Sequence, residues 1–296
     1  MKIEKVGLMT PGDMGQGVAM QIKAKGFPVY TALAKRSERS RALARDAGLT
    51  DVGTIERLVA ECDVILSVMN PGAAVDFARD AAGALLSTGR KTLIVDCNAI
   101  APDTVHEVAR IIEGAGGRFL DGGLIGPPPR GKAKVNLYVS GPGAADLQAI
   151  GGSQLVVTVV SERLADASAL KMCYGGLNKG TQALWLEILM AAQRLGVAEL
   201  LEQQLRASRA DLLDWAYSQY PKMPPKAYRW VPEMIEISKT LGSAGITPKV
   251  FQGAAEIFEF VAGTALGKET PEQSRGTERS GQEVVRSLAE ERSAKR

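Results

Sequence analysis

Near its amino end the chain reads Val6-Gly7-Leu8-Met9-Thr10-Pro11-Gly12-Asp13-Met14-Gly15. An apolar strand that runs into a glycine-bearing turn, which then opens a helix, is the order of elements that a dinucleotide-binding site requires. Gly12 and Gly15 let backbone amides approach a pyrophosphate, and a helix beginning near Asp13 adds partial positive charge. The first glycine of the usual G-x-G-x-x-G fingerprint is replaced by Thr10. The expected cofactor contacts are Thr10, Pro11, Gly12, Asp13, Met14 and Gly15.

The second predicted strand, residues 29–33, runs into Ala34-Lys35-Arg36-Ser37. An NAD-type site places an acid here to bind the ribose hydroxyls, yet no acid stands between Asp13 and Glu38. A guanidinium suits a phosphate group, and the missing carboxylate removes repulsion of a 2′-phosphate. Lys35, Arg36 and Ser37 are therefore predicted to favour NADPH over NADH. The alternative is a solvated loop with ordinary surface cations.

Composition restricts the class of protein. The chain has 296 residues, 45% of them hydrophobic and 23% charged, which suits a globular protein with two domains. A net charge of +3 is too small to indicate nucleic acid as a partner. No apolar run has transmembrane length and no leader pattern precedes the first strand, so we expect a cytoplasmic protein away from membranes. The three cysteines lack metal-ligand spacing and are expected to be small buried residues, and no metal site is predicted.

The order of predicted elements indicates an α/β protein. Residues 1–160 alternate apolar strands with amphipathic helices, as in an N-terminal Rossmann-type doubly wound sheet that binds NADP. The strands are expected at 6–9, 29–33, 64–68, 92–96, 118–120, 135–139 and 155–160, and helices at 13–25, 54–60, 74–86 and 104–113. Residues 122–131 are expected to form a loop. Residues 161–296 are predicted to be an all-helical substrate and dimerisation domain, with a long helix over 164–195. The charged tail is expected to carry a surface helix at 282–291 or to be partly disordered.

Polar residues follow several of these strands. Ligands of an open α/β sheet bind beyond the carboxyl ends of its strands. Met69, Asn70, Pro71 and Ala74 follow one strand and Asn98 follows another, so all five are candidate cofactor contacts. Asn70 is equally well explained as a turn residue that caps the next helix. For Asn98, a contact with the cofactor is the favoured interpretation.

The segment 169–182 places a cation in an otherwise apolar helix. Residues 171, 174, 175, 178 and 182 are expected along one stripe of that helix. Gly175 and Gly176 each cost about 1 kcal/mol relative to alanine, which close approach of a ligand or of the first domain would offset. Lys171 beside a carbonyl oxygen could donate or accept a proton during hydride transfer. The alternative is a lysine whose stem packs at a helix seam. The only histidine, His106, is expected at an exposed helical position, so the acid–base group is not histidine.

In its amino-terminal turn and in the segment 169–182, the chain resembles the β-hydroxyacid dehydrogenase superfamily, which includes 3-hydroxyisobutyrate and 6-phosphogluconate dehydrogenases. The family pattern G-x-I-G-L-G-x-M-G falls on residues 7–15, and K-M-V-H-N-G-I-E-Y-G falls on residues 171–180. The segment 226–234 is typical of a branch whose helical C-terminal domain has unknown function. The resemblance implies that Lys171 is the general acid in ketone reduction and the base in alcohol oxidation.

The predicted substrate site departs from the family pattern. The family's D-x-P-V-S-G-G becomes Asp121-Gly122-Gly123-Leu124-Ile125-Gly126-Pro127, so Ile125 replaces a serine that binds a carboxylate. Gly175, Asn178 and Lys179 replace further polar family residues. We expect a larger, less polar pocket in which Lys179, Arg130 or Arg229 meets an anion. The expected substrate contacts are Gly123, Leu124, Ile125, Tyr174, Gly175, Asn178 and Lys179.

The sequence thus predicts an NADPH-dependent dehydrogenase or reductase acting on a β-hydroxy acid or its keto or semialdehyde form. An imine reductase is an alternative, although imine reductases usually carry another residue in place of Lys171. A non-catalytic NADPH-binding or sensing protein is a further alternative. We also expect a homodimer, with Trp185, Leu186, Leu189 and residues 215–220 in its interface.

Overall fold

The computed structural model describes residues 2–34, 36–270, 273–274 and 276–291. The chain divides into two compact units, unit 1 ending at Met172 and unit 2 beginning at Cys173. The division falls inside helix α6 (Asp166–Gly175), later than the expected boundary at 160/161. The first turns of α6 are bonded to strands of unit 1, which explains why they belong to it.

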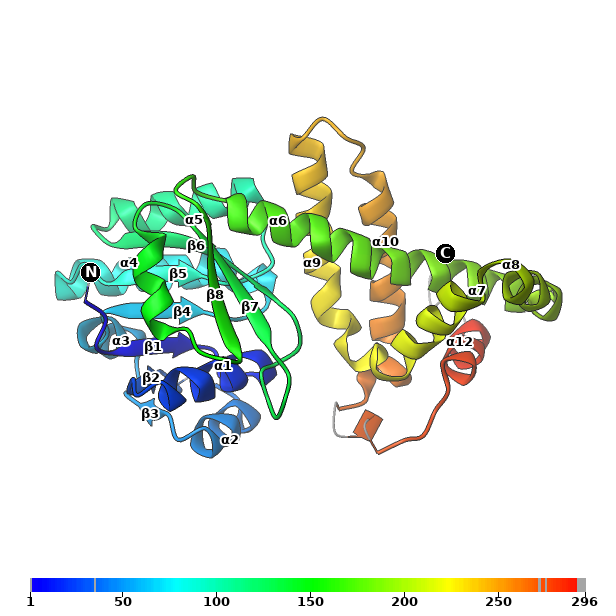
Figure 1. The fold of residues 1–296 in the computed structure, drawn as a ribbon, viewed down its shortest axis with the longest axis horizontal. Coiled ribbons are helices and arrows are strands. Elements are labelled where there is room, and N and C mark those ends of the chain that lie inside the picture. Colours follow the sequence, from blue (N-terminus) through cyan, green and yellow to red (C-terminus); the bar gives the residue numbers. More distant parts are fainter. Residues whose placement is uncertain (1, 35, 271–272, 275, 292–296) are drawn as a thin grey trace. The chain divides into compact units, whose positions relative to one another are not determined.

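Unit 1 is built on one eight-stranded sheet with the order β3-β2-β1-β4-β5-β6-β7-β8 (Figure 1). All neighbouring strands are parallel except β6 and β7, which are antiparallel. This order confirms the predicted Rossmann-type sheet. The strands are β1 (Val6–Met9), β2 (Val29–Thr31), β3 (Thr50–Asp51), β4 (Val64–Ser67), β5 (Leu93–Asp96), β6 (Arg118–Ile125), β7 (Val135–Ser140) and β8 (Leu155–Ser161).

The central strands β1, β4 and β5 are buried on both sides, because helices cover both faces of the sheet there. On β5, Leu93 and Val95 join one apolar core, whereas Ile94 between them joins the other. The first core includes residues of α1, and the second includes residues of α3, α4 and α5. The helices of unit 1 before α6 are α1 (Asp13–Ala24), α2 (Glu38–Asp46), α3 (Ile55–Glu61), α4 (Ala74–Thr88) and α5 (Pro102–Gly114), with short turns η1 (Pro71–Ala73) and η2 (Ala144–Ile150).

The expected loop at 122–131 is partly wrong, because residues 122–125 continue strand β6. Glycines usually weaken a strand, but here they allow close approach of other backbone. A Cβ added at Gly122 would lie 3.0 Å from the Asp96 carbonyl oxygen. One at Gly123 would lie 3.0 Å from the Ala167 carbonyl oxygen on α6. These glycines therefore let β6 lie directly against β5 and α6.

Unit 2 contains helices and no strand among its described residues, which confirms the predicted all-helical region. After α6 the chain forms a π-helical turn, η3, and then continues as α7. None of the described helices is both long enough and apolar enough to span a membrane. The elements of unit 2 after α6 are η3 (Gly176–Gly180), α7 (Thr181–Arg194), α8 (Ala198–Gln219), η4 (Tyr220–Lys222), η5 (Pro224–Lys226), α9 (Ala227–Ser243), α10 (Lys249–Gly263), η6 (Leu266–Lys268) and α12 (Gly281–Glu290).

Glycines of η3 let another helix pack closely. A Cβ added at Gly180 would lie 2.7 Å from the ring of Phe251 on α10, and one at Gly176 would lie 3.1 Å from it. A Cβ at Gly175 would lie 3.3 Å from the Glu233 carboxylate on α9. Packing against α9 and α10 therefore helps to offset the cost of these glycines, while the expected close approach of a ligand or of the first domain stays a prediction.

Two further expectations change in unit 2. Helix α12 begins one residue before the predicted surface helix, but Val284, Val285 and Leu288 are buried, so it is part of the core of the unit. Cys62 and Cys97 are buried as expected, whereas Cys173 is exposed.

Candidate active site

Three of the predicted cofactor segments meet at the carboxyl edge of the sheet. Strands β1, β4 and β5 are neighbours, so the turns after Met9, Ser67 and Asp96 lie side by side. The Thr10 amide donates to the Val68 carbonyl oxygen at 3.0 Å. The Met69 amide donates to Asn98 Oδ1 at 2.6 Å. The sheet order thus brings together residues 10–15, 69–71 and 98.

The turn at residues 10–15 is closely packed on one side and open on the other. A Cβ added at Gly15 would lie 2.1 Å from the Thr10 carbonyl oxygen, so only glycine fits there. At Gly12, by contrast, no atom lies within 4 Å of an added Cβ, and the turn is open on that side. Gly12 is also the N-cap of α1 and provides no capping side chain. The first amides of α1 are therefore suited to an anionic group.

The side chains of Asn98 and Asn70 form hydrogen bonds that stabilise the turns in which these residues lie. The buried Asn98 side chain donates to Ser67 Oγ at 2.9 Å and to Asp96 Oδ2 at 2.8 Å, while its oxygen accepts from Met69. Asn70 Oδ1 accepts from the Gly72 amide at 3.1 Å. Asn98 thus links the ends of β4 and β5. Ala74 begins α4 and is buried, while Met69 and Pro71 are partly exposed.

Arg36 and Ser37 follow the end of β2, and Lys35 lies outside the described residues. Ser37 Oγ accepts from the Ser40 amide and caps α2. Arg36 is half-buried; burial lowers the pKa of its guanidinium, while the Asp80 carboxylate opposes that shift. Among the described residues its side chain makes no hydrogen bond or ion pair, so this buried cation has room for an anionic partner.

A carboxylate that the sequence interpretation missed lies near this position. Asp51 on β3 pairs with Thr31 at the end of β2. Its Oδ1 accepts from the Leu33 amide at 3.0 Å and the Gly53 amide at 2.8 Å. Through these two hydrogen bonds Asp51 stabilises the loop after β2. A two-residue strand with both residues exposed has no apolar pattern from which it could be predicted.

Two arginines contact the amino end of α1. Arg39 donates to Asp13 Oδ1 at 3.0 Å, and Arg130 donates to the Asp13 carbonyl oxygen at 3.2 Å. Arg130 also bonds to Gln16, and Pro129 lies against Gly17. The proline-rich segment therefore packs on α1, which puts the expected substrate cation Arg130 beside the cofactor turn. Arg39 was not singled out from the sequence, because a surface arginine in a polar segment carries no distinct pattern.

Lys171 reaches the same carboxyl edge from α6. Its half-buried side chain donates from Nζ to the Cys97 carbonyl oxygen at 3.1 Å, immediately after β5. A Cβ added at Gly123 would lie 3.2 Å from Lys171 Cβ, so the stem of the lysine lies on β6. Lys171 and Asn98 thus belong to one site, within unit 1.

Two buried carboxyl groups lie beside this lysine. Asp96 and Asp121 occupy paired positions on β5 and β6. Burial raises the pKa of Asp96 to about 7, against the hydrogen bonds from Asn98, and it also raises the pKa of Asp121. The Lys171 ammonium lowers the pKa of both carboxyls. The site therefore contains one cation that offsets two buried acids.

The predicted substrate residues are divided between the two units. Gly123 and Leu124 are buried in β6, and Ile125 at its end is partly exposed. In unit 2, Tyr174 and Asn178 are exposed, and Asn178 Oδ1 accepts from Gln182 at 2.7 Å. Lys179 forms an ion pair with the largely buried Glu233 and lies 5.2 Å from the Trp230 ring centroid. Lys179 is thus already paired within unit 2. Arg229 lies 6.0 Å from the Tyr228 ring centroid.

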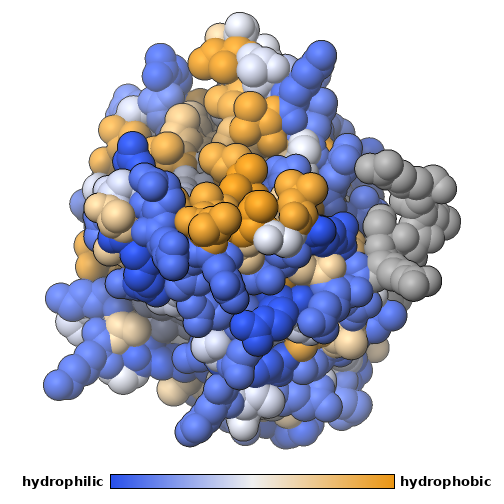
Figure 2. All heavy atoms as spheres, turned by 90° about the vertical axis from the view of Figure 1, so that its right-hand side faces the viewer, coloured by the Kyte–Doolittle hydropathy of each residue, from blue (hydrophilic) through white to orange (hydrophobic). Residues whose placement is uncertain are grey.

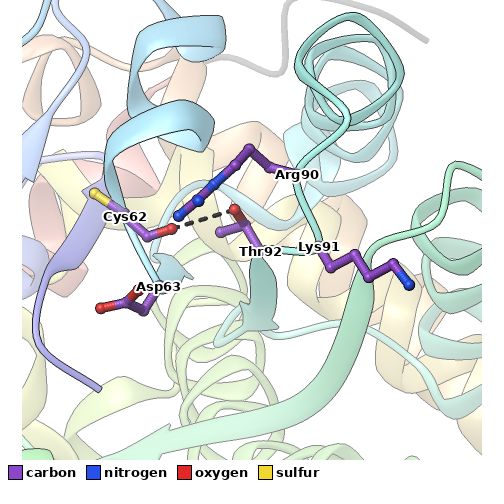
Figure 3. A pocket seen from close by; sticks show the side chains of 5 residues that line it. All are labelled: Cys62, Asp63, Arg90, Lys91 and Thr92. Carbon is purple, nitrogen blue, oxygen red and sulfur yellow. Dashed lines mark hydrogen bonds between the residues drawn. The ribbon is translucent and has the colours of Figure 1, made fainter. Parts of the chain in front are cut away.

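A separate small cavity of about 220 Å³ lies at the opposite edge of the sheet, where β4 and β5 begin (Figure 3). It is lined by Cys62, Asp63, Arg90, Lys91 and Thr92. Thr92 Oγ1 donates to the carbonyl oxygens of Val59 and Cys62, which closes the cavity floor. Parallel sheets bind ligands at their carboxyl edge, so this cavity is not part of the candidate site. In the described part of the chain no cluster of three or more His, Cys, Asp or Glu is arranged to hold a metal ion.

Comparison with known proteins agrees with this geometry. Residues 5–149 match the NAD binding domain of 6-phosphogluconate dehydrogenase, and residues 192–261 match a domain family of unknown function, DUF1932. A solved conserved protein of unknown function, described as structurally similar to 3-hydroxyacid dehydrogenases, is 30% identical, with a TM-score of 0.63. The match covers 87% of this chain and 96% of that one. The chain belongs to the β-hydroxyacid dehydrogenase superfamily, in the branch with a helical C-terminal domain.

Other relatives are more distant. An uncharacterised 28.5 kDa protein of Methanothermus fervidus is 25% identical over 87% of this chain and 98% of its own length. A 3-hydroxyisobutyrate dehydrogenase of Salmonella typhimurium is 15% identical over 92% and 98% of the two chains, with a TM-score of 0.67. An imine reductase of Myxococcus stipitatus, solved with NAD⁺, is 20% identical over 93% and 100%, with a TM-score of 0.51. The last two share the fold.

Proposed function

We propose that the protein is an NADPH-dependent dehydrogenase or reductase that acts on a β-hydroxy acid or on its keto or semialdehyde form. The observation that carries the proposal is the bond from Lys171 Nζ to the Cys97 carbonyl oxygen, beside the turns of a nucleotide-binding sheet. A protonated amine at this edge is within reach of a carbonyl group held next to the cofactor.

Different residues of this chain bind the cofactor and transfer the proton. The open side of the turn at Gly12 admits a pyrophosphate, which the first amides of α1 bind. When bound, the nicotinamide supplies or accepts the hydride. Lys171 donates its proton to the substrate oxygen as a carbonyl is reduced, and accepts the hydroxyl proton in the reverse direction. The Cys97 carbonyl oxygen orients the amine between turnovers.

Preference for NADPH rests on Arg36, a half-buried guanidinium at the end of β2. We expect Arg36→Ala to weaken NADPH binding about 30-fold, as loss of a charge-assisted contact costs about 2 kcal/mol. NADH affinity should change less than twofold. Calorimetric titration of both cofactors measures this, with Arg45→Ala at an exposed position of α2 as the matched control. Equal losses for NADPH and NADH would contradict the assignment of the 2′-phosphate to Arg36.

Turnover assays with different substrates distinguish a hydroxy-acid dehydrogenase from an imine reductase. The shared fold of the imine reductase makes cyclic imines the second candidate substrates. Purified protein is assayed for NADPH consumption with β-keto acids and semialdehydes, for NADP⁺ reduction with hydrophobic β-hydroxy acids and glycerate-like acids, and for NADPH consumption with imines. Activity confined to imines would overturn the hydroxy-acid assignment. NADPH binding without turnover of any of these would favour a sensing protein.

We further propose a homodimer formed by the apolar surface of unit 2. Figure 2 shows hydrophobic residues gathered over the upper part of one face, bordered by hydrophilic residues. Four of the nine interface residues expected from the sequence are core residues instead: Leu186, Leu189, Ala216 and Tyr220 are buried. The exposed apolar side chains of α7 are Leu184 and Ile188, at 58% and 50% of their full exposure.

We expect Leu184→Asp/Ile188→Asp to convert a dimer into a monomer of 31.4 kDa, because buried carboxylates without partners oppose association. Light scattering at micromolar concentration measures the mass. Leu86→Asp on α4, where the leucine is 69% exposed, is the control and should leave the mass unchanged. A wild-type protein that is already monomeric would contradict the dimer.

A further inference from the structure

The first turn of α6 is capped by groups from the sheet. The residue before the helix, Ala165, has φ of +75° and a side chain that cannot accept a hydrogen bond. The first amides of a helix have no partners within it, and buried amides need acceptors from elsewhere. In α6 the amides of Ala167 and Ser168 are buried.

Asp121 is the centre of the capping group. Its Oδ2 accepts from the Ser168 amide at 2.8 Å, and its Oδ1 accepts from the Ser168 hydroxyl at 2.5 Å. The Ala167 amide donates to Ser140 Oγ at 3.0 Å, and that hydroxyl donates to Asp121 Oδ2 at 2.9 Å. Asp121 and Ser140 are themselves paired across β6 and β7. The fully buried Asp121 carboxylate thus links α6 to strands β6 and β7 by hydrogen bonds.

Lys171 lies one turn beyond this point of attachment. It follows Ser168 by three residues, so both are on the same face of α6. That face lies on Gly123, where a Cβ would be 3.2 Å from Lys171 Cβ. The distance between helix and strand therefore sets where the lysine stem begins. The other end of the side chain is held at the Cys97 carbonyl oxygen.

Three groups on two strands interact electrostatically with Lys171. Asp96 and Cys97 belong to β5 and its carboxyl end, and Asp121 belongs to β6. The lysine lowers the pKa of all three, so each anion in turn favours the charged lysine. Cys97 remains a neutral thiol because burial raises its pKa far above the usual range. Of these three groups, Asp96 and Asp121 are therefore the acids that influence the proton on Lys171.

We propose that Asp121 is the positioning residue of Lys171: it caps α6 from β6, fixes the lysine over the carboxyl edge, and supplies negative charge that favours the ammonium form. This assignment rests on the proposed role of Lys171 as the proton donor. Asp121 acts through the helix and through its charge, and it does not touch the substrate.

Asp121→Asn tests the proposal, because it keeps the shape and removes the charge. Without substrate or cofactor, the pH dependence of Lys171 acetylation by an amine reagent is followed by peptide mass spectrometry. We expect its midpoint to move about one unit to lower pH. In carbonyl reduction, kcat should fall at least tenfold and the alkaline limb of its pH profile should move to lower pH by the same amount. NADPH affinity should stay within twofold.

Asp166→Asn is the matched control. Asp166 is in the same turn of α6, but it is partly exposed and pairs with Ser161 and Arg163. Its replacement should move neither the acetylation midpoint nor the pH limb. If Asp121→Asn does not fold, Ser168→Ala removes one bond to the carboxylate and keeps the charge. It should lower kcat severalfold at an unchanged acetylation midpoint, and unchanged kcat would overturn the proposal.

The outcomes separate this proposal from the proposed function. A shifted acetylation midpoint in a protein that turns over none of the tested substrates supports the positioning by Asp121 and contradicts the dehydrogenase assignment. Lysine-dependent turnover, with midpoint and limb unchanged in Asp121→Asn, contradicts the positioning and leaves the dehydrogenase assignment intact.

Discussion

Replacement of Lys171 by alanine is expected to lower kcat about 10³-fold, within the range for loss of a general acid. NADPH affinity should change less than twofold, because the lysine belongs to α6 and the cofactor turns belong to β1, β4 and β5. The measurements are steady-state turnover with the best substrate found and calorimetric titration of NADPH.

Lys171→Arg distinguishes charge from proton transfer. A guanidinium keeps the positive charge beside Asp96 and Asp121 but does not release its proton in a protein. We expect Lys171→Arg to be as inactive as Lys171→Ala while retaining more thermal stability, because the two buried acids keep a cation nearby. Near-normal turnover in Lys171→Ala would exclude the lysine as the acid and would favour a water molecule or another side chain in that role.

Gly15→Ala is expected to abolish NADPH binding and to destabilise unit 1. The added Cβ would lie 2.1 Å from the Thr10 carbonyl oxygen, a backbone atom that moves only with the whole turn. Overpacking of this kind costs about 2–3 kcal/mol, or a fall of about 5–10 °C in Tm. Thermal unfolding without ligand and calorimetric titration measure the two effects.

Gly12→Ala is the matched variant three residues earlier. Its added methyl group meets no atom within 4 Å, and the φ of −84° at this position suits alanine. The Tm without ligand should therefore stay within about 1 °C. NADPH affinity should still fall at least tenfold, because the methyl group fills space that the pyrophosphate needs. Unchanged affinity in Gly12→Ala would contradict the proposed position of the phosphates.

Strands β1, β4 and β5 could be predicted because each is a short, fully buried apolar run. The first prediction, 6–9, coincides with β1, and 64–68 and 92–96 differ from β4 and β5 by one residue. Helix α2 and strand β3 were not predicted, since α2 contributes only Ala44 to the interior and β3 is exposed. Their place is set by contacts with α1 and β2, such as the bond from Gln16 to the Leu43 carbonyl oxygen. Contacts between segments far apart in the chain produce no recognisable pattern in the local sequence.

The candidate site could be predicted in outline because carboxyl ends of neighbouring parallel strands must meet. Lys171 lies at that edge, where its Nζ donates to the Cys97 carbonyl oxygen. The partners of the buried polar groups could not be predicted, since Asn98 bonds to residues about 30 positions earlier. The same is true of Asp121, whose bonds to Ser168 span 47 positions. The individual cofactor and substrate contacts stay predictions, which the variants above test.

The expected stripe 171, 174, 175, 178 and 182 assumed a regular α-helix. The turn η3 closes with one residue more than an α-helical turn, so side chains after it no longer follow the same period. Lys179 forms its ion pair with Glu233 on α9, whereas Asn178 and Gln182, which are four residues apart, remain bonded to each other as on a regular helix. Periodicity cannot reveal such a turn, because Gly176 and Gly180 have no side chain to break the pattern.

This turn also allows α6 and α7 to form one continuous helix although the chain has a residue more than a regular helix would need. A π-helical turn takes up one residue more than an α-helical turn in nearly the same rotation, so η3 absorbs that residue without turning the helix that follows. Deleting one residue of η3 is therefore expected to leave Leu186 and Leu189 facing the core and Leu184 facing outward. An insertion within the regular part of α7 has no such turn to absorb it, and it would rotate every later side chain by about 100°.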